Sequence, residues 1–223
     1  MAILITGGSG YIGSHTCLEM LTAGYDIVVL DNYCNSKPEV IRRVQTLSGK
    51  TFPVYEGDVR DKACLQKVFS EQSIDAVIHF AGLKAVGEST QKPLMYYDNN
   101  VTGTLVLCEV MAEHGCKRLI FSSSATVYNA DLPSPRTEDM PTGAVSNPYG
   151  RTKLYIEETI RDVALAHPGG PGMVGGAAAV FQPHRRARKR SAGRRPARHS
   201  QQPDAVHFAG RHRQTRAAVG VRR

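Results

Sequence analysis

The chain of 223 residues contains no tryptophan and five cysteines, none of them in a Cys-x-x-Cys pair. An odd set of this kind argues against a disulfide framework and against a zinc site, and we expect no bound metal. No apolar run reaches the roughly 18 residues that a membrane span needs. The chain also starts with a strand-like apolar run, without the charged start of a secretory signal. These absences favour a reduced, cytoplasmic protein that contacts no membrane.

Acidic residues are scarce in the last part of the chain. Up to Asp162, 15 lysines and arginines stand against 19 acidic residues, a net charge of −4. After Asp162, 13 basic residues stand against Asp204 alone, a net charge of +12. The overall charge of +8 therefore comes from the C-terminal part, and the sequence joins two segments of different character.

Short apolar segments alternate with helical patterns over residues 1–166. Continuous apolar strands between helices are typical of a parallel sheet that is covered on both faces, so the sequence predicts an α/β fold with a doubly wound parallel sheet. The predicted strands are Ala2–Thr6, Ile27–Leu30, Val54–Tyr55, Ala76–Phe80 and Arg118–Phe121. The predicted helices are Ile12–Leu21, Pro38–Leu47, a segment around Leu65–Phe69, Pro93–His114 and Pro148–Ala166.

The pattern changes after residue 168. Glycine and proline over His167–Gly176 predict a linker, and Ala177–Phe181 has the composition of one more strand. From Gln182 onward there is no sustained apolar period, so we expect this basic tail to be disordered. The predicted domains are a doubly wound α/β domain over residues 1–168 and a linker with an arginine-rich tail over residues 169–223.

A glycine-rich loop follows the first predicted strand, with the spacing Gly7-x-x-Gly10-x-x-Gly13. Glycines here let backbone N–H groups approach a diphosphate, and the following helix N-terminus favours negative charge. The alternative is a tight turn without a ligand. The order of strand, loop and helix favours a dinucleotide.

Two aspartates follow the next strands. Asp31 can accept hydrogen bonds from an adenosine ribose and would repel a 2′-phosphate, which selects NAD over NADP. Asp58 is placed to meet the adenine amino group. The alternatives are an ordinary turn residue for Asp31 and a helix cap for Asp58. His79 has no accompanying metal-type residue, and we predict that it packs inside its strand.

Tyr149 and Lys153 lie four residues apart in the last predicted helix, which puts both on one face. A phenol titrates near pH 10 and is a weak base at neutral pH. A neighbouring ammonium favours the phenolate, so we expect Lys153 to lower the pKa of Tyr149. Such pairs are common on solvated helices. Ser124 favours a catalytic role for this pair, because it follows the fifth strand at the edge where open α/β sheets hold ligands.

Together these residues resemble the extended, nucleotide-sugar-modifying branch of the short-chain dehydrogenase/reductase superfamily, and within it the UDP-glucose 4-epimerases. The likeness is nearly continuous over residues 1–168, and the segment Phe80–Ser89 is especially specific. Dehydratases of this branch carry an acidic pair after the position of Thr126, where this chain has Val127 and Tyr128. Dehydration is therefore disfavoured.

The resemblance implies a set of site residues. It makes Tyr149, Lys153 and Ser124 catalytic, with Ser124 and Tyr149 also touching the substrate. Lys84 would contact phosphate and Lys153 the nicotinamide ribose. Phe80 could instead be an ordinary strand end, and Asn99 a satisfied polar group of its helix. The residues implied to line NAD are Gly7, Gly10, Tyr11, Ile12, Gly13, Asp31, Asn32, Tyr33, Cys34, Asn35, Ser36, Asp58, Val59, Phe80, Ala81, Gly82, Leu83, Lys84, Asn99, Ser124, Tyr149 and Lys153.

The implied activity is that of an isomerase that interconverts UDP-glucose and UDP-galactose. The sugar would lose its 4-hydroxyl proton to Tyr149 and its hydride to NAD, turn its other face as a 4-keto sugar, and take the hydride back. The resemblance is also compatible with a homodimer.

The resemblance ends at about Gly169. Phe181-Gln182-Pro183 has glutamine where the family has asparagine. The residues that follow are rich in arginine and poor in acidic residues, which is the composition expected when a GC-rich gene is translated in the wrong reading frame. We therefore hypothesise a frameshifted or truncated C-terminal part, with NAD binding retained and turnover feeble.

Two alternatives stay open. The enzyme could act on another nucleotide sugar such as UDP-glucuronate, as an epimerase or decarboxylase. The chain could also be a non-catalytic NAD-binding fragment whose tail, at Arg185–Arg190 and Arg194–Arg198, contacts nucleic acid non-specifically. The tail has no motif for specific nucleic-acid binding.

Overall fold

The structure, a computed structural model, describes residues 1–133, 135–166 and 174–176. These residues form one parallel sheet with the strand order β3-β2-β1-β4-β5-β6. The strands are β1 (Ala2–Thr6), β2 (Ile27–Asp31), β3 (Val54–Glu56), β4 (Ile74–His79), β5 (Arg118–Phe121) and β6 (Val174–Gly176). The order reverses at β1, which confirms the predicted doubly wound sheet and places its switch point between β1 and β4.

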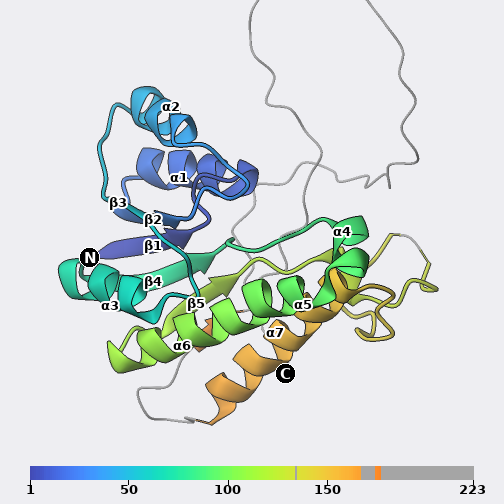
Figure 1. Cartoon of the computed structure of the whole chain (residues 1–223). Coiled ribbons are helices and arrows are strands. Elements are labelled where there is room, and N and C mark those ends of the chain that lie inside the picture. The colour runs from blue at the N-terminus through green and yellow to red at the C-terminus, as the bar shows by residue number, and fades with distance from the viewer. Residues whose placement is uncertain (134, 167–173, 177–223) are drawn as a thin grey trace, which may run out of the picture.

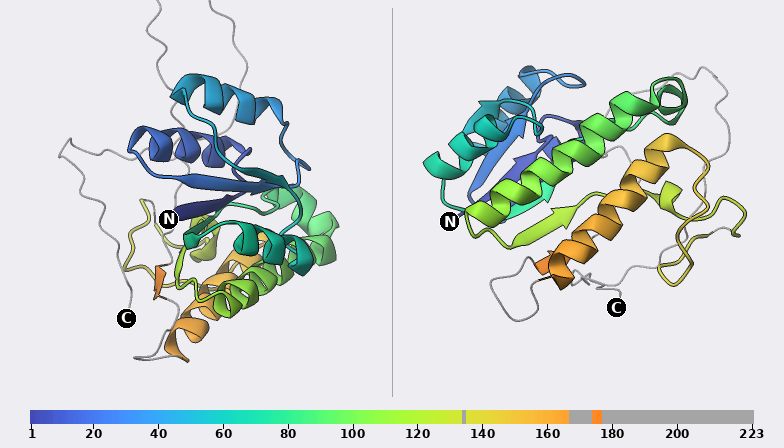
Figure 2. Two further views of the ribbon diagram at one scale, coloured as in Figure 1. Left: turned by 90° about the vertical axis from the view of Figure 1, so that its left-hand side faces the viewer. Right: turned by 60° about the horizontal axis from the view of Figure 1, so that its bottom comes forward.

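Helices cover both faces of the sheet (Figures 1 and 2). One face carries α1 (Tyr11–Thr22) and α2 (Glu39–Ser48). The other carries α3 (Lys62–Glu71), α6 (Gly103–Glu113) and α7 (Pro148–Leu165). Among the described residues, no helix combines the length and the apolar character needed to cross a membrane.

Neighbouring residues of one strand belong to different layers of the core. Leu4 packs with buried residues of α3, α6 and α7, whereas Ile5 packs with those of α1 and α2. Both side chains are fully buried. Because successive strand side chains point to opposite faces, a sheet covered on both sides needs apolar residues at every position. This explains the continuous apolar runs of the sequence.

The long helix predicted over Pro93–His114 is interrupted. It consists of α5 (Pro93–Tyr96), the π-helical turn η1 (Tyr97–Thr102) and α6. A further helix, α4 (Val86–Gln91), precedes it and was not predicted from the sequence. Within the π-helical turn the Asn100 side chain donates to the Leu83 carbonyl and to the Thr152 hydroxyl, contacts that helical periodicity does not indicate.

The C-terminal predictions are only partly covered by the described residues. Val174–Gly176, which we placed in a linker, pairs in parallel with β5. The strand predicted at Ala177–Phe181 and the basic clusters Arg185–Arg190 and Arg194–Arg198 lie outside the described residues.

His79 lies inside the fold, as predicted, and is 1% exposed. Its Nδ1 is 2.6 Å from the Thr6 hydroxyl and its Nε2 is 3.0 Å from the Thr104 hydroxyl. Thr104 donates its own proton to the Asn100 carbonyl, so it accepts from Nε2, and Thr6 donates to Nδ1. This chain of bonds needs a neutral imidazole, and burial lowers the pKa of His79 from 6.5 to about 3.

The buried imidazole predicts a loss of stability in acid. The unfolded chain takes up the proton near pH 6.5 and the folded chain only near pH 3, so the free energy of unfolding falls as the pH drops through this window. Down to about pH 4.5 we expect His79 to contribute a loss of about 2–3 kcal/mol. Urea unfolding of the parent and of His79→Asn at both ends of this range measures it. Equal losses in the two proteins would contradict the assignment.

Candidate active site

The glycine-rich loop packs against the backbone after β4. Gly7 has a φ of +70°, and a Cβ there would lie 2.7 Å from the Ala81 nitrogen. A Cβ at Gly13 would lie 2.2 Å from the Gly7 carbonyl oxygen. Gly10 precedes α1, and no described side chain caps this N-terminus. The first N–H groups of α1 therefore remain available to an anion, and this loop fits a dinucleotide diphosphate.

Asp31 connects the loops after β1 and β2. Its Oδ2 accepts from the Ser9 backbone at 2.8 Å. Its Oδ1 accepts from the Tyr33 backbone at 2.9 Å and from the Ser36 hydroxyl at 3.0 Å. A carboxylate has about four lone-pair sites, so one remains for an outside donor such as a ribose hydroxyl. The buried carboxylate is both a structural anchor and a candidate ribose ligand.

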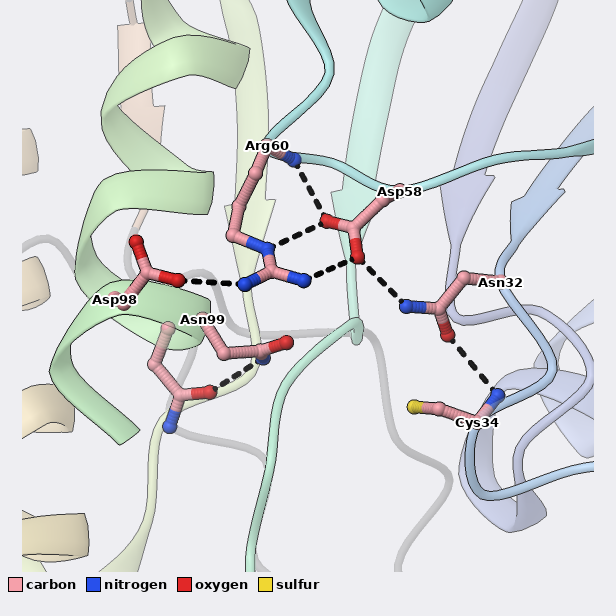
Figure 3. Close-up of polar contacts among 7 residues, drawn as sticks. Asn32, Cys34, Asp58, Arg60, Asp98 and Asn99 are labelled. Atoms are coloured by element: carbon pink, nitrogen blue, oxygen red, sulfur yellow. Dashed lines mark hydrogen bonds and ion pairs between the residues drawn. The ribbon is translucent and has the colours of Figure 1, made fainter. Parts of the chain in front are cut away.

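Asp58 is surrounded by donors (Figure 3). The Asn32 amide donates to its Oδ2 at 2.9 Å, and Arg60 donates from its backbone and its guanidinium. This guanidinium holds the pKa of Asp58 well below its usual range. The alternative role of helix cap is wrong, because Asp61 caps α3 by accepting from the Cys64 backbone.

The segment after β4 is fixed by Asn100, which the sequence analysis did not assign to the site. Its Oδ1 accepts from the Leu83 backbone at 2.8 Å, and its Nδ2 donates to the Leu83 carbonyl at 2.9 Å. Nδ2 also donates to the Thr152 hydroxyl on α7 at 3.1 Å. Two successive asparagines inside a helical pattern were the available signal, since asparagine is a poor helix former.

The first turns of α7 present Tyr149 and Lys153. Asn147 caps the helix by accepting from the Gly150 backbone at 2.8 Å, and Pro148 occupies the first turn. The Lys153 amine donates to the Ser122 carbonyl at 2.9 Å and lies 4.5 Å from the centre of the Phe121 ring. Burial lowers the pKa of this amine to about 8.

The expected lowering of the Tyr149 pKa is wrong for this structure. Burial raises the pKa of the phenol, and a hydrogen bond with Ser124 opposes that rise. The Ser124 hydroxyl also accepts from the Thr126 hydroxyl at 3.0 Å. The expectation rested on the charge of Lys153 one helical turn away, which would lower the pKa of Tyr149. Burial has the larger effect and raises this pKa, because a buried phenolate loses its hydration.

Most predicted site residues lie at one edge of the sheet, where β1 to β5 end. Tyr11 is exposed and its ring packs edge-on against His15, and Lys84 and Cys34 are also exposed. Val59 is buried in the core layer shared with α3, α6 and α7, whereas Phe80 is partly buried against the layer shared with α1 and α2. Ile12, Tyr33, Ser36, Ala81, Gly82, Leu83 and Asn99 are partly buried, and Asn32 and Asn35 are exposed.

Asn99 satisfies part of its own hydrogen bonding by donating to the Asn100 side chain at 3.0 Å. This bond agrees with the alternative in which Asn99 is a polar helix residue with partners inside the protein. Within the described ranges, no group of three or more histidine, cysteine or acidic residues could hold a metal ion.

Comparison with known proteins agrees with this arrangement. The model of the NAD dependent epimerase/dehydratase family matches residues 3–218. A UDP-glucose 4-epimerase of Bacillus subtilis is 58% identical over 166 residues, which are 74% of this chain and 49% of that protein. The chain thus spans about half the length of the curated relatives it matches.

Solved structures show the same likeness. A UDP-glucose 4-epimerase of Bifidobacterium longum in complex with NAD+ and UDP has a TM-score of 0.75 and 50% identity, covering 81% of this chain and 52% of that one. A UDP-Glc/GlcNAc 4-epimerase of Campylobacter jejuni has a TM-score of 0.71 and 38% identity, covering 75% and 50%.

Proposed function

The chain belongs to the NAD-dependent epimerase/dehydratase family, and on that premise we propose that it binds NAD and interconverts UDP-glucose and UDP-galactose. The proposal rests on one observation. Ser124, Tyr149 and Lys153 lie at the edge of the sheet where the glycine-rich loop also lies. The buried phenol of Tyr149, the buried amine of Lys153 and the partly buried hydroxyl of Ser124 can handle the proton of a sugar hydroxyl. The solved relative with NAD+ and UDP and the curated UDP-glucose 4-epimerases support the same chemistry.

In this mechanism NAD, when bound, supplies the hydride acceptor for carbon 4 of the sugar. Tyr149 in its phenolate form takes the proton of the 4-hydroxyl and later returns it, although burial raises its pKa and so disfavours that form. Ser124 hydrogen-bonds to the same oxygen, as it already does to the phenol. Lys153, with a pKa of about 8, stays mostly protonated at neutral pH and offsets the charge of a phenolate.

Asp31, Asn100 and the glycine-rich loop hold the parts of this site in place. Asp31 fixes the loop after β2, and Asn100 joins the segment at Leu83 to α7. Orientation of the reacting groups supplies a large share of the rate in such a reaction, because it replaces the search for a productive encounter.

The choice of sugar is tested with a panel of nucleotide sugars. The chain is supplied with NAD and with UDP-galactose, UDP-N-acetylglucosamine or UDP-glucuronate, and the products are separated by chromatography. We expect UDP-galactose to be converted to UDP-glucose faster than the other two react. Faster turnover of UDP-glucuronate, with loss of carbon dioxide, would instead favour the decarboxylase alternative.

A further inference from the structure

The Phe121 side chain is buried at the end of β5, on the face of the sheet that α7 covers. It is 0% exposed and lies in the same core layer as Ile156 and Ile160 of α7. In the sheet it is paired with His79 of β4, and the centres of the two rings are 5.9 Å apart. Side chains in a close-packed interior keep one rotamer. The position of the Phe121 ring is therefore fixed by β4 and α7 together.

The amine of Lys153 lies over the face of this ring. Its Nζ is 4.5 Å from the ring centre, and it donates to the Ser122 carbonyl at 2.9 Å. Lys153 is only 5% exposed. The face of an aromatic ring is negative relative to its edge, and it attracts an ammonium within about 6 Å of the ring centre. The ring and the carbonyl therefore both supply negative potential to a buried ammonium.

The other groups around the ammonium carry little charge. Glu157, one turn further along α7, favours the charged form of the amine, and Tyr149, one turn earlier, has a neutral phenol because burial raises its pKa. His79 on β4 is neutral for the same reason of burial. The segment after β4 meets the amine at Gly82, where an added Cβ would lie 3.7 Å from Nζ. The carbonyl and the ring face thus take the place of the water that burial removes.

We infer that Phe121 is a positioning residue that acts through Lys153, because its ring face holds the ammonium charged and at a fixed point one helical turn from Tyr149. The inference rests on the proposed function, in which this charge offsets a Tyr149 phenolate. Burial already lowers the pKa of Lys153 to about 8. Loss of the ring face would lower it further and leave much of the amine uncharged at neutral pH.

The first test measures the titration of Lys153 directly, by NMR of the full chain without added dinucleotide. The chain carries an isotope label at the lysine ε-carbon, and the Lys153 signal is identified by its absence in Lys153→Met. We expect the midpoint of this titration to fall by about one pH unit in Phe121→Leu. This shift is a tenfold change in the protonation equilibrium, which is the size expected for a desolvated contact between an ammonium and a ring.

A graded series separates the charge of the ring face from its packing. Phenylalanines with one, two or three fluorine atoms in place of Phe121 nearly keep the size of the ring and weaken the negative potential of its face stepwise. The midpoint should fall with each fluorine, while thermal melting stays close to that of the parent. Phe69→Leu removes another buried ring of the same core layer, beside His114, and is the matched control. Its Lys153 titration should equal that of the parent.

The same variants connect the ring to the proposed reaction. The conversion of UDP-galactose needs the ammonium, so its rate declines as the pH rises through the Lys153 titration. This decline should move to lower pH together with the titration, and most in Phe121→Leu. A variant that acted through packing alone would lower the rate by the same factor at every pH.

The outcomes are distinct. A titration midpoint that stays constant across the fluorinated series would overturn the inference and leave the proposed function standing. A midpoint that moves while the pH dependence of turnover stays the same would also overturn it, because the ring would then have no part in the reaction. Absence of turnover by the parent at every pH, with NAD supplied, would overturn the proposed function and the positioning role with it. Movement of the titration and of the turnover profile together is the expected result.

Discussion

Replacing Gly13 by alanine is expected to weaken NAD binding by roughly a hundredfold. The added Cβ would lie 2.2 Å from the Gly7 carbonyl oxygen and 2.8 Å from the Gly8 Cα, and both are backbone atoms that cannot rotate away. The first turn of α1 must then move off the loop that would hold the diphosphate. Overpacking of this kind costs up to about 3 kcal/mol, which corresponds to roughly a hundredfold in affinity. Calorimetric titration with NAD measures the effect.

Gly87→Ala is the matched control. Gly87 lies in α4, its φ is not in the left-handed region, and an added Cβ would meet no described atom within 4 Å. Its NAD affinity should equal that of the parent. If Gly13→Ala bound NAD within about threefold of the parent, a change of less than 1 kcal/mol, the glycine-rich loop would not be the diphosphate site.

Tyr149→Phe is expected to reduce the conversion of UDP-galactose by about a thousandfold, within the usual range for removal of a general acid–base group. The ring is buried and is retained, so only the hydroxyl that bonds with Ser124 is lost. The fold should therefore survive. Because we expect the parent chain to turn over slowly, the comparison needs saturating NAD, long incubation and chromatographic detection of UDP-glucose.

Tyr155→Phe removes a hydroxyl from the same helix and serves as the control. Its side chain is 46% exposed and its ring lies near Tyr97. This variant should convert UDP-galactose at the rate of the parent. A Tyr149→Phe variant that retained more than about a tenth of the parent rate would remove Tyr149 from the role of proton acceptor.

Residues whose role depends on local pattern were predicted well. The apolar runs located β1 and β5 at their observed bounds, although only β1 is covered on both faces, whereas Arg118 and Ile120 of β5 are exposed. The glycine spacing located the loop at Gly7 to Gly13, since only glycine fits its close backbone contacts. Spacing on one helix likewise paired Tyr149 with Lys153 on α7.

Residues whose role depends on distant partners were missed. Arg60 meets Asp98, and Asn100 meets Leu83 and Thr152, only after the sheet has brought these segments together. The spacing of residues within one helix or strand does not predict contacts between segments that are far apart in the sequence. The raised pKa of Tyr149 has the same origin, because helical spacing predicts a neighbouring charge and says nothing of burial.

The most direct test of the account is a calorimetric comparison of NAD and NADP binding to this chain. Asp31 is buried at the end of β2, and its carboxylate would face a 2′-phosphate with like charge. We predict that NAD binds and that NADP binds at least about tenfold more weakly, a difference of about 1.4 kcal/mol. Equal affinity for the two dinucleotides would contradict the assignment of Asp31 and the cofactor site built around it.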